Sequence, residues 1–265
     1  MFLGNTEVLA VSKTQLDQMS ARRNFTLAMM SMSCVTSAII GSYTQMVPGK
    51  YVLTAIPLNI LGAIIISAIL NPTKVAPEDD VIVGVAGGDN KKAPFFSFLG
   101  DSILGAGKLI LIITATVIAF VSLAAMIDQL LSLTGLRWLT LENMFGVVMF
   151  PFAWLLGFNA HEAFQIAQFM GTKLVTNEFV VMGEVSKNIM AQKGLFANEH
   201  ARIVLTVFLT SFANFGTLGM IIGAFKGLVS QEKNDYLSAR VPYMLLAGIL
   251  VSLVSAAAAG LFVWS

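Results

Sequence analysis

The sequence is poor in charged residues, which make up 12% of its 265 positions. A soluble domain has about 25% charged residues with which to cover its surface. Cysteine occurs once, as Cys34, so an internal disulfide framework is excluded. The two histidines, His161 and His200, stand too far apart in sequence for a recognisable metal motif. The net charge of +1 gives no indication of a nucleic-acid partner.

Long apolar stretches take the place of the missing charge. Hydrophobic residues make up 56% of the chain, and several runs approach or exceed the ~20 residues that cross a bilayer as a helix. We therefore predict an integral membrane protein with several spans. The predicted crossings are residues 27–47, 51–70, 103–133, 203–225 and 241–264.

The segments between these crossings differ in character. NPTKVAPEDDVIVGVAGGDNKKAP is rich in proline, glycine and charge and is expected to be an aqueous loop. FFSFLGD, which follows it, is expected to form a short helix along the interface. Residues 144–156 are apolar but too short to cross, which favours an interfacial or re-entrant piece. Residues 160–190 are interrupted by GTKLVTNEF and are too broken for a plain span.

The positions of lysine and arginine orient the predicted spans. With five crossings the loops fall into two sets, and the positive-inside rule places the richer set in the cytoplasm. The richer set is Lys13, Arg22, Arg23, Lys74, Lys91, Lys92, Lys226, Lys233 and Arg240. The poorer set is Lys50, Arg137, Lys187, Lys193 and Arg202. The C-terminus is then expected on the outer side.

Two stretches of the chain resemble each other. SMSCVTSAIIGSY and FANFGTLGMIIGAF both place small polar residues before Ile-Ile-Gly and an aromatic residue. Each follows a carboxylate in a short polar break, Glu7 in the first case and Glu178 in the second. Matched interrupted segments in two halves are typical of the binding site of a transporter. Since the predicted orientation has the two copies entering from opposite sides, we predict an inverted repeat.

The second copy contains an amide deep in an apolar run. Residues 203–225 extend about 35 Å if helical, and Asn214 lies near their middle. Irregular backbone survives at membrane depth only where protein or a water-filled cavity surrounds it, so a polar break here implies a substrate or ion site. Two other interpretations stay open, because Asn214 alone also fits an interhelical hydrogen bond and Glu178 also fits a surface loop tip. Lys173 is expected to snorkel towards the interface.

GNTE, GTKLVTNEFV and SFANFGTLGMIIGA, in this order, resemble the C-terminal part of the concentrative nucleoside transporters. The resemblance implies an all-α membrane protein with an inverted repeat, re-entrant hairpins and broken transmembrane helices. It divides the chain into three parts: a partial first repeat at 1–71, a cytoplasmic loop, interfacial helix and long transmembrane helix at 72–142, and a second repeat at 143–265. It also implies a transport domain that moves against a scaffold in a homotrimer.

The resemblance implies where a nucleobase would bind. Asn5, Thr6 and Glu7 would face the edge of the base, while Ile39 and Phe212 would pack against it. Asn5 stands where the family often has glutamine, and this shorter side chain leaves the preference between purines and pyrimidines open.

The ribose and a cation would have separate sites. Glu178, Asn214 and Thr217 would hold the ribose hydroxyls, since a carboxylate accepts two bonds from a diol and an amide both donates and accepts. A Na+ site built mainly of backbone carbonyls would involve Leu3, Cys34 and Val35. Because a thiol is a poor ligand for Na+ and sodium-coupled members tend to have serine in place of Cys34, proton coupling through a carboxylate is a serious alternative.

The predicted function is symport of nucleosides across the cytoplasmic membrane, driven by Na+ or H+ through an elevator-like movement, without enzymatic activity. Met1 falls inside the first hairpin of the family pattern, so we expect an incomplete transporter that does not transport alone. Two alternatives are a transporter or channel for another solute or ion and a non-transporting membrane fragment. A membrane enzyme ranks last, because no nucleophile–base pair, metal motif or phosphate loop is found.

Overall fold

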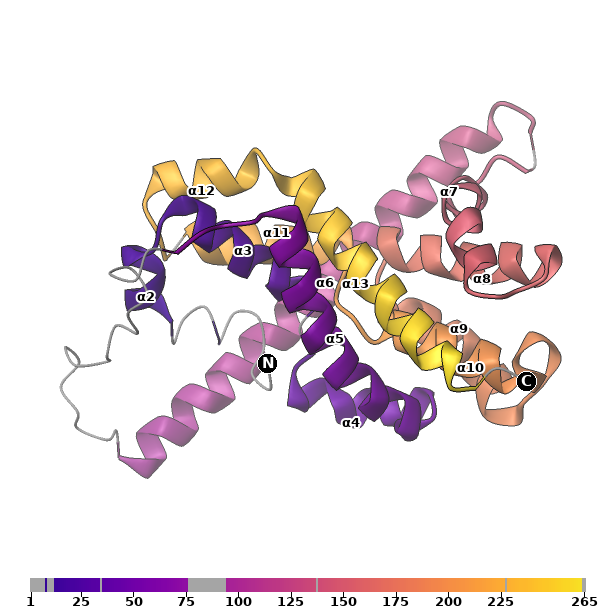
Figure 1. The fold of residues 1–265 in the computed structure, drawn as a ribbon, viewed down its shortest axis with the longest axis horizontal. Helices are drawn as coiled ribbons and strands as arrows, with labels where there is room; N and C mark the ends of the chain where they lie inside the picture. The colour runs from indigo at the N-terminus through magenta and orange to yellow at the C-terminus, as the bar shows by residue number, and fades with distance from the viewer. Residues whose placement is uncertain are drawn as a thin grey trace.

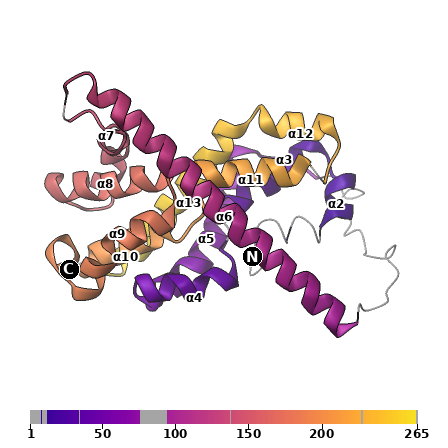
Figure 2. The ribbon, with the colours of Figure 1, turned by 180° about the vertical axis from the view of Figure 1, so that it is seen from behind.

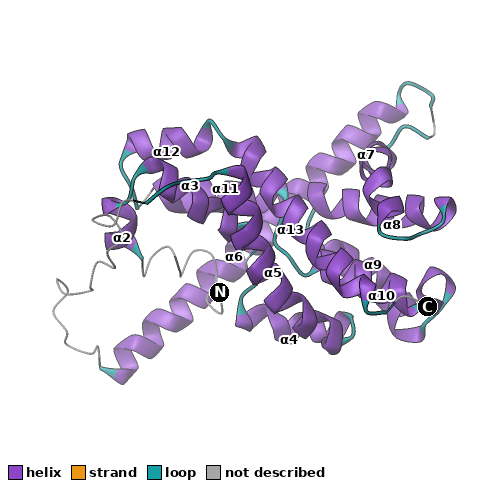
Figure 3. Ribbon diagram, in the orientation of Figure 1, coloured by secondary structure: helices purple, strands orange, loops and turns teal. Residues whose placement is uncertain are grey.

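The computed structural model describes residues 8, 12–33, 35–75, 94–136, 138–226 and 228–263. These residues form helices joined by short loops, without a strand among them (Figure 3). In chain order the helices are α2 (Lys13–Gln18), α3 (Ala21–Ser31), α4 (Ser37–Met46), α5 (Gly49–Leu70), α6 (Phe95–Ser132), α7 (Leu141–Leu155), α8 (Ala160–Val175), α9 (Glu178–Ala191), η2 (Gly194–Ala197), α10 (Glu199–Leu209), α11 (Phe215–Lys226), α12 (Gln231–Ser238) and α13 (Val241–Leu261).

Two of the predicted crossings are interrupted near their middle. The first consists of α3 and α4, which are separated by residues 32–36. The second consists of α10 and α11, which are separated by residues 210–214. The break predicted at Asn214 is therefore present, and each pair of half-helices is followed by a long apolar helix, α5 in the first case and α13 in the second.

Helix α13 runs diagonally through the middle of the molecule and packs against α3, α5 and α10 (Figure 1). A Cβ atom added to Gly248 would lie 2.7 Å from the Cβ of Ala213 and 3.1 Å from the Cβ of Met32. Ala213 and Met32 belong to the two helix interruptions, so α13 passes directly against both of them. At the next contact on α5, a Cβ on Gly62 would lie 3.2 Å from Val251. Small residues thus permit the close approach of these helices.

Asparagine side chains cap several of the helices that surround the second interruption. Asn159 forms a capping box with Glu162 at the start of α8, and Asn177 accepts a hydrogen bond from the backbone of Val180 in the first turn of α9. Asn198 does the same for His200 at the start of α10. Each cap satisfies backbone N–H groups that have no partner within the helix. Two residues, Thr176 and Asn177, separate α8 from α9.

Residues 95–132 form one continuous helix of 38 residues, α6, which extends about 57 Å along one face of the molecule (Figure 2). The separate interfacial helix expected at FFSFLGD is therefore wrong, because this segment is the first part of α6. Leu111 and Ile118 are among many exposed apolar side chains on this helix.

Two helices among the described residues are long and apolar enough to cross a membrane, Gly49–Leu70 and Val241–Leu261. Two shorter apolar helical segments are Asn143–Leu155, which is part of α7, and Phe215–Lys226, which is α11. The half-helices of the two interrupted crossings are each too short to cross a membrane alone, so they are not among the two long helices. These findings agree with a membrane protein whose crossings are partly interrupted.

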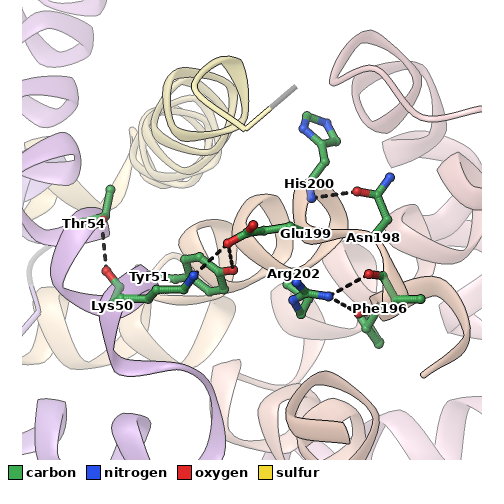
Figure 4. Close-up of polar contacts among 9 residues, drawn as sticks. Lys50, Tyr51, Thr54, Phe196, Asn198, Glu199, His200 and Arg202 are labelled. Carbon is green, nitrogen blue, oxygen red and sulfur yellow. Dashed lines mark hydrogen bonds and ion pairs between the residues drawn. The ribbon is translucent and has the colours of Figure 1, made fainter. Parts of the chain in front are cut away.

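Polar contacts join helix α5 to neighbouring helices at both of its ends. At one end, Glu199 at the start of α10 accepts hydrogen bonds from Lys50 at 2.7 Å and from Tyr51 at 2.6 Å (Figure 4). At the other end, Arg22 on α3 donates to the Oδ1 atom of Asn71 at 3.1 Å and to the carbonyl of Pro72 at 2.9 Å. Lys50 is the second residue of α5, and Asn71 directly follows its last residue. These two groups of contacts therefore lie at opposite ends of this helix.

Candidate functional site

Glu178 is the first residue of α9 and is almost completely buried, with 3% of its surface exposed. Its Oε1 atom accepts a hydrogen bond from the hydroxyl of Tyr43 at 3.0 Å. Its Oε2 atom accepts one from the Nδ2 atom of Asn214 at 3.1 Å. The surface loop tip considered for Glu178 is therefore wrong. A buried carboxylate of this kind is costly without partners, and here each oxygen has one.

Asn214 is held by the start of α11. Its Oδ1 atom accepts hydrogen bonds from the backbone N–H of Thr217 at 2.8 Å and from the Thr217 hydroxyl at 3.2 Å. The amide thus acts as an N-cap, which leaves its Nδ2 group to point at Glu178. Asn214, Thr217 and Glu178 are each less than 5% exposed. The structure therefore brings together the three residues that the family resemblance assigns to the ribose.

The start of a helix lies close to each side chain of this group. Glu178 occupies the first turn of α9, and Asn214 immediately precedes α11. The N-terminus of a helix carries a partial positive charge and unpaired N–H groups. Both helix starts favour an anionic or hydroxyl-rich group at this point, which is why the fold tolerates a carboxylate there.

Tyr43 connects this group to the first broken helix. It lies on α4, it is completely buried, and its ring packs against Phe179 with 5.2 Å between the ring centroids. Glu178 consequently bridges α4 and the start of α11, which are 135 and 36 positions away from it in sequence. Tyr43 was not predicted from the sequence. Its signal is an aromatic residue with a hydroxyl at the end of the first copy, where the second copy has Phe225.

Apolar residues expected beside a base belong to the core that surrounds Tyr43. Ile39 and Phe212 are each 8% exposed and lie in the same apolar cluster as Tyr43. Val35, expected near a cation, is 5% exposed and lies in this cluster too. This cluster extends from α4 to α13, so shared membership does not bring the three side chains into contact. Their roles towards a ligand stay predictions.

The position of the Lys173 side chain differs from the one predicted from the sequence. It is completely buried, so the prediction that it snorkels to the interface is wrong. Its Nζ atom donates a hydrogen bond to the Oγ atom of Ser211 at 3.2 Å and lies 5.0 Å from the centroid of the Phe208 ring. The side chain therefore points from α8 into the protein, towards the interruption between α10 and α11.

Five of the predicted site residues fall outside the described residues: Leu3, Asn5, Thr6, Glu7 and Cys34. Most of the predicted base-reading group and two members of the predicted cation site are among them. Among the residues that are described, no group of three or more histidine, cysteine, aspartate or glutamate side chains is arranged to hold a metal ion. A site for Na+ built of backbone carbonyls would not require such a group.

Comparison with known proteins connects this geometry to a family. A family model described as the Na+ dependent nucleoside transporter C-terminus matches residues 51–260. The purine nucleoside transport protein NupG of Bacillus subtilis is 45% identical over 264 residues, which cover 100% of this chain and 64% of NupG. An uncharacterised transporter of Haemophilus influenzae is 27% identical over 99% of this chain and 64% of its own length.

A solved structure agrees with the fold over almost the whole chain. The structure of CNTnw in an inward-facing substrate-bound state superimposes with a TM-score of 0.85 at 25% identity, covering 99% of this chain and 63% of CNTnw. The chain thus spans just under two thirds of the length of these relatives. The relatives are transporters, in agreement with the expectation that this chain is not an enzyme. The all-helical fold, the broken helices and the match over residues 51–260 show that the chain belongs to the Na+ dependent nucleoside transporter family, of which it contains the C-terminal part.

Proposed function

We propose that this chain provides the ribose-binding part of a nucleoside symporter in the cytoplasmic membrane. The observation that carries the proposal is the convergence of Glu178, Asn214 and Thr217 at the second helix interruption. A carboxylate that accepts and an amide that both donates and accepts match the two hydroxyls of a ribose. The name of the relative NupG, a purine nucleoside transport protein, supports the same substrate class.

Binding of a ribose at this site requires an exchange of partners. Without a ligand, the Oε2 atom of Glu178 and the Nδ2 atom of Asn214 bond to each other. A ribose hydroxyl would insert between them, donate to the carboxylate and accept from the amide. Since hydrogen bonds to charged groups are stronger than neutral ones, Glu178 supplies more of the affinity than Asn214.

The driving ion and the movement belong to the same proposal. Na+ or H+ would couple to the nucleoside, with the cation site near Val35 and with residues outside the described part of the chain. The two interrupted crossings and the long helices after them would form two inverted repeats within a transport domain. That domain would move past a scaffold in a homotrimer embedded in the lipid bilayer.

The first prediction tests the ribose site with Glu178→Gln, measured in a purified transporter that contains this chain. This variant keeps the shape of the side chain but removes its charge. We expect the dissociation constant for a nucleoside to rise about 10- to 100-fold, which corresponds to the loss of charge-assisted hydrogen bonds. A thermal-shift titration measures the change, since a ligand stabilises only the state that binds it.

The matched control is Glu232→Gln, at an exposed position in α12, for which we expect an unchanged dissociation constant. An unaltered affinity in Glu178→Gln would remove this residue from the ribose site. Stabilisation of the parent protein by free nucleobases or amino acids, but not by nucleosides, would instead favour a transporter of another solute class.

A further inference from the structure

Lys173 is a buried cation with no role in the proposed contacts to a nucleoside. It lies on α8, five residues before Glu178, with none of its surface exposed. Its partners come from two other elements, because Ser211 lies in the interruption between α10 and α11 and the ring of Phe208 belongs to α10. A buried ammonium group is expensive unless its charge is compensated and its N–H groups are bonded.

The hydrogen bonds that begin at Lys173 form a directed chain. Ser252 on α13 donates its hydroxyl proton to the carbonyl of Gly248 at 2.8 Å. Ser252 must therefore accept from Ser211 in the bond between their hydroxyls, and Ser211 in turn accepts from Lys173. The order Lys173 to Ser211 to Ser252 to Gly248 satisfies each hydroxyl with one donated and one accepted bond. The chain ties α8 and the interruption to α13.

The series of hydrogen bonds from Lys173 ends at Gly248, where α13 meets the two helix interruptions. Gly248 is the residue whose added Cβ would contact both Ala213 and Met32. Ser211 directly precedes Phe212 and lies three positions before Asn214, within the same unwound segment. The anchor at Lys173 therefore fixes the stretch of backbone that presents Asn214 to Glu178.

Lys173 and Glu178 carry opposite charges and are both buried, yet they do not pair directly. Among the described residues, the direct ion pair is the exposed one between Lys50 and Glu199. The oxygens of Glu178 bond instead to Tyr43 and Asn214. Opposite charges attract over longer distances inside a protein than in water, because the low dielectric screens them less. Lys173 can compensate the charge of Glu178 without occupying the oxygens that a ligand needs.

We infer that Lys173 is a positioning residue of the nucleoside site, which balances the charge of Glu178 from a distance and holds the unwound segment through Ser211 and Ser252. It does not touch the substrate. The link to a nucleoside rests on the proposed function, whereas the coupling of Lys173 to Glu178 is a property of the protein without ligand. The two are tested separately.

A double-mutant cycle without ligand tests the charge balance. The proteins are the parent, Lys173→Met, Glu178→Gln and the double variant, purified as a transporter that contains this chain, and the readout is the melting temperature. Lys173→Met leaves a buried carboxylate uncompensated and should lower the melting temperature by about 5 °C or more. The double variant has no charge at either position 173 or position 178, so at least half of that loss should return.

The control cycle replaces an exposed lysine on α9, with Lys187→Met in place of Lys173→Met. Its effect should be small and should add to that of Glu178→Gln. Additive effects of Lys173→Met and Glu178→Gln would overturn the inference, since a lysine that only fills space would behave in this way. If Lys173→Met yields no folded protein, recovery of folded protein in the double variant supports the inference and failure of both overturns it.

Ser252→Ala tests the hydrogen-bond chain while it keeps both charges. We expect the nucleoside dissociation constant to rise about 3- to 10-fold, with the coupling between positions 173 and 178 retained. An unchanged dissociation constant would show that the hydrogen bonds from Lys173 through Ser211 and Ser252 do not position Asn214. Absence of nucleoside binding in the parent would refute the proposed function alone, because the cycle without ligand would still report the charge balance.

Discussion

The hydroxyl of Tyr43 supplies one of the two partners of Glu178, from a helix 135 positions earlier in the chain. Tyr43→Phe removes this hydrogen bond but keeps the ring that packs against Phe179. The freed carboxylate oxygen would be left without a partner in a buried site. We expect the melting temperature to fall, because a buried hydrogen bond to a charged group contributes about 1.5–3 kcal/mol to stability. We expect the nucleoside dissociation constant to rise about 3- to 10-fold, because Tyr43 acts on the ligand only through the position of Glu178.

Tyr243→Phe is the matched control for this prediction, since Tyr243 lies on α13 with 55% of its surface exposed. Isothermal titration of both variants with the same nucleoside measures the difference. Equal affinities in the two variants would show that Tyr43 does not support the carboxylate.

The sequence predicts part of the site at the scale of residues. The meeting of Glu178 and Asn214 follows from two polar breaks in apolar surroundings, where unpaired polar groups must find each other. Lys173 and Tyr43 were not predicted as partners of this site. A lysine near a helix end fits snorkelling as well as burial, and the depth of its side chain depends on packing against Ser211 and Phe208, which are distant in sequence.

At the scale of elements, the contact of α13 with both interruptions depends on a residue without a side chain. Gly248→Ala would place a Cβ atom 2.7 Å from that of Ala213, and one of the two backbones would have to move. We expect a destabilisation of about 1–3 kcal/mol, which is typical of overpacking, together with weaker nucleoside binding because Asn214 follows Ala213 directly. Thermal unfolding and a nucleoside titration measure both effects.

Gly219→Ala in α11 is the control for this element. A Cβ at Gly219 would meet no atom within 4 Å, and alanine favours a helix more than glycine does. This variant should keep or slightly raise the melting temperature. A loss of stability as large as that of Gly248→Ala would show that the helix contact at α13 is not the cause.

The elements themselves were predictable to different degrees. The interruption within residues 203–225 was predicted from Asn214 and the glycines after it, which lower helix propensity. The structure places the interruption at residues 210–214, before these glycines, which belong to α11. The joining of FFSFLGD to the following span was not predicted. Gly100 and Asp101 disfavour a helix by only about 1 kcal/mol each, and no proline stands between them and residue 132. The long apolar run after them therefore carries the helix through, and α6 is continuous.

At the scale of the whole molecule, several of the described cations make contacts near one or the other end of α5. Arg22 contacts Asn71 at the C-terminal end of α5, and Lys233 on α12 donates a hydrogen bond to the backbone carbonyl of Asp17, which precedes α3. At the opposite end, a Cβ on Gly260 of α13 would lie 2.9 Å from the ring of His200, beside Glu199 and Lys50. The first end carries residues of the richer set of cations, and the second carries residues of the poorer set. The fold thus agrees with the division of the loops made from the sequence.

The last prediction is that the end with Lys50 and Glu199 faces the outside of the cell. Cys34→Ser removes the single cysteine, and Ala197→Cys or Glu232→Cys then adds one at an exposed position of either end. On intact cells, a membrane-impermeant thiol reagent should label position 197, while position 232 should react only after the membrane is opened. This follows because positively charged loops are retained in the cytoplasm. Labelling in the reverse order would show that the orientation predicted from the cations is wrong.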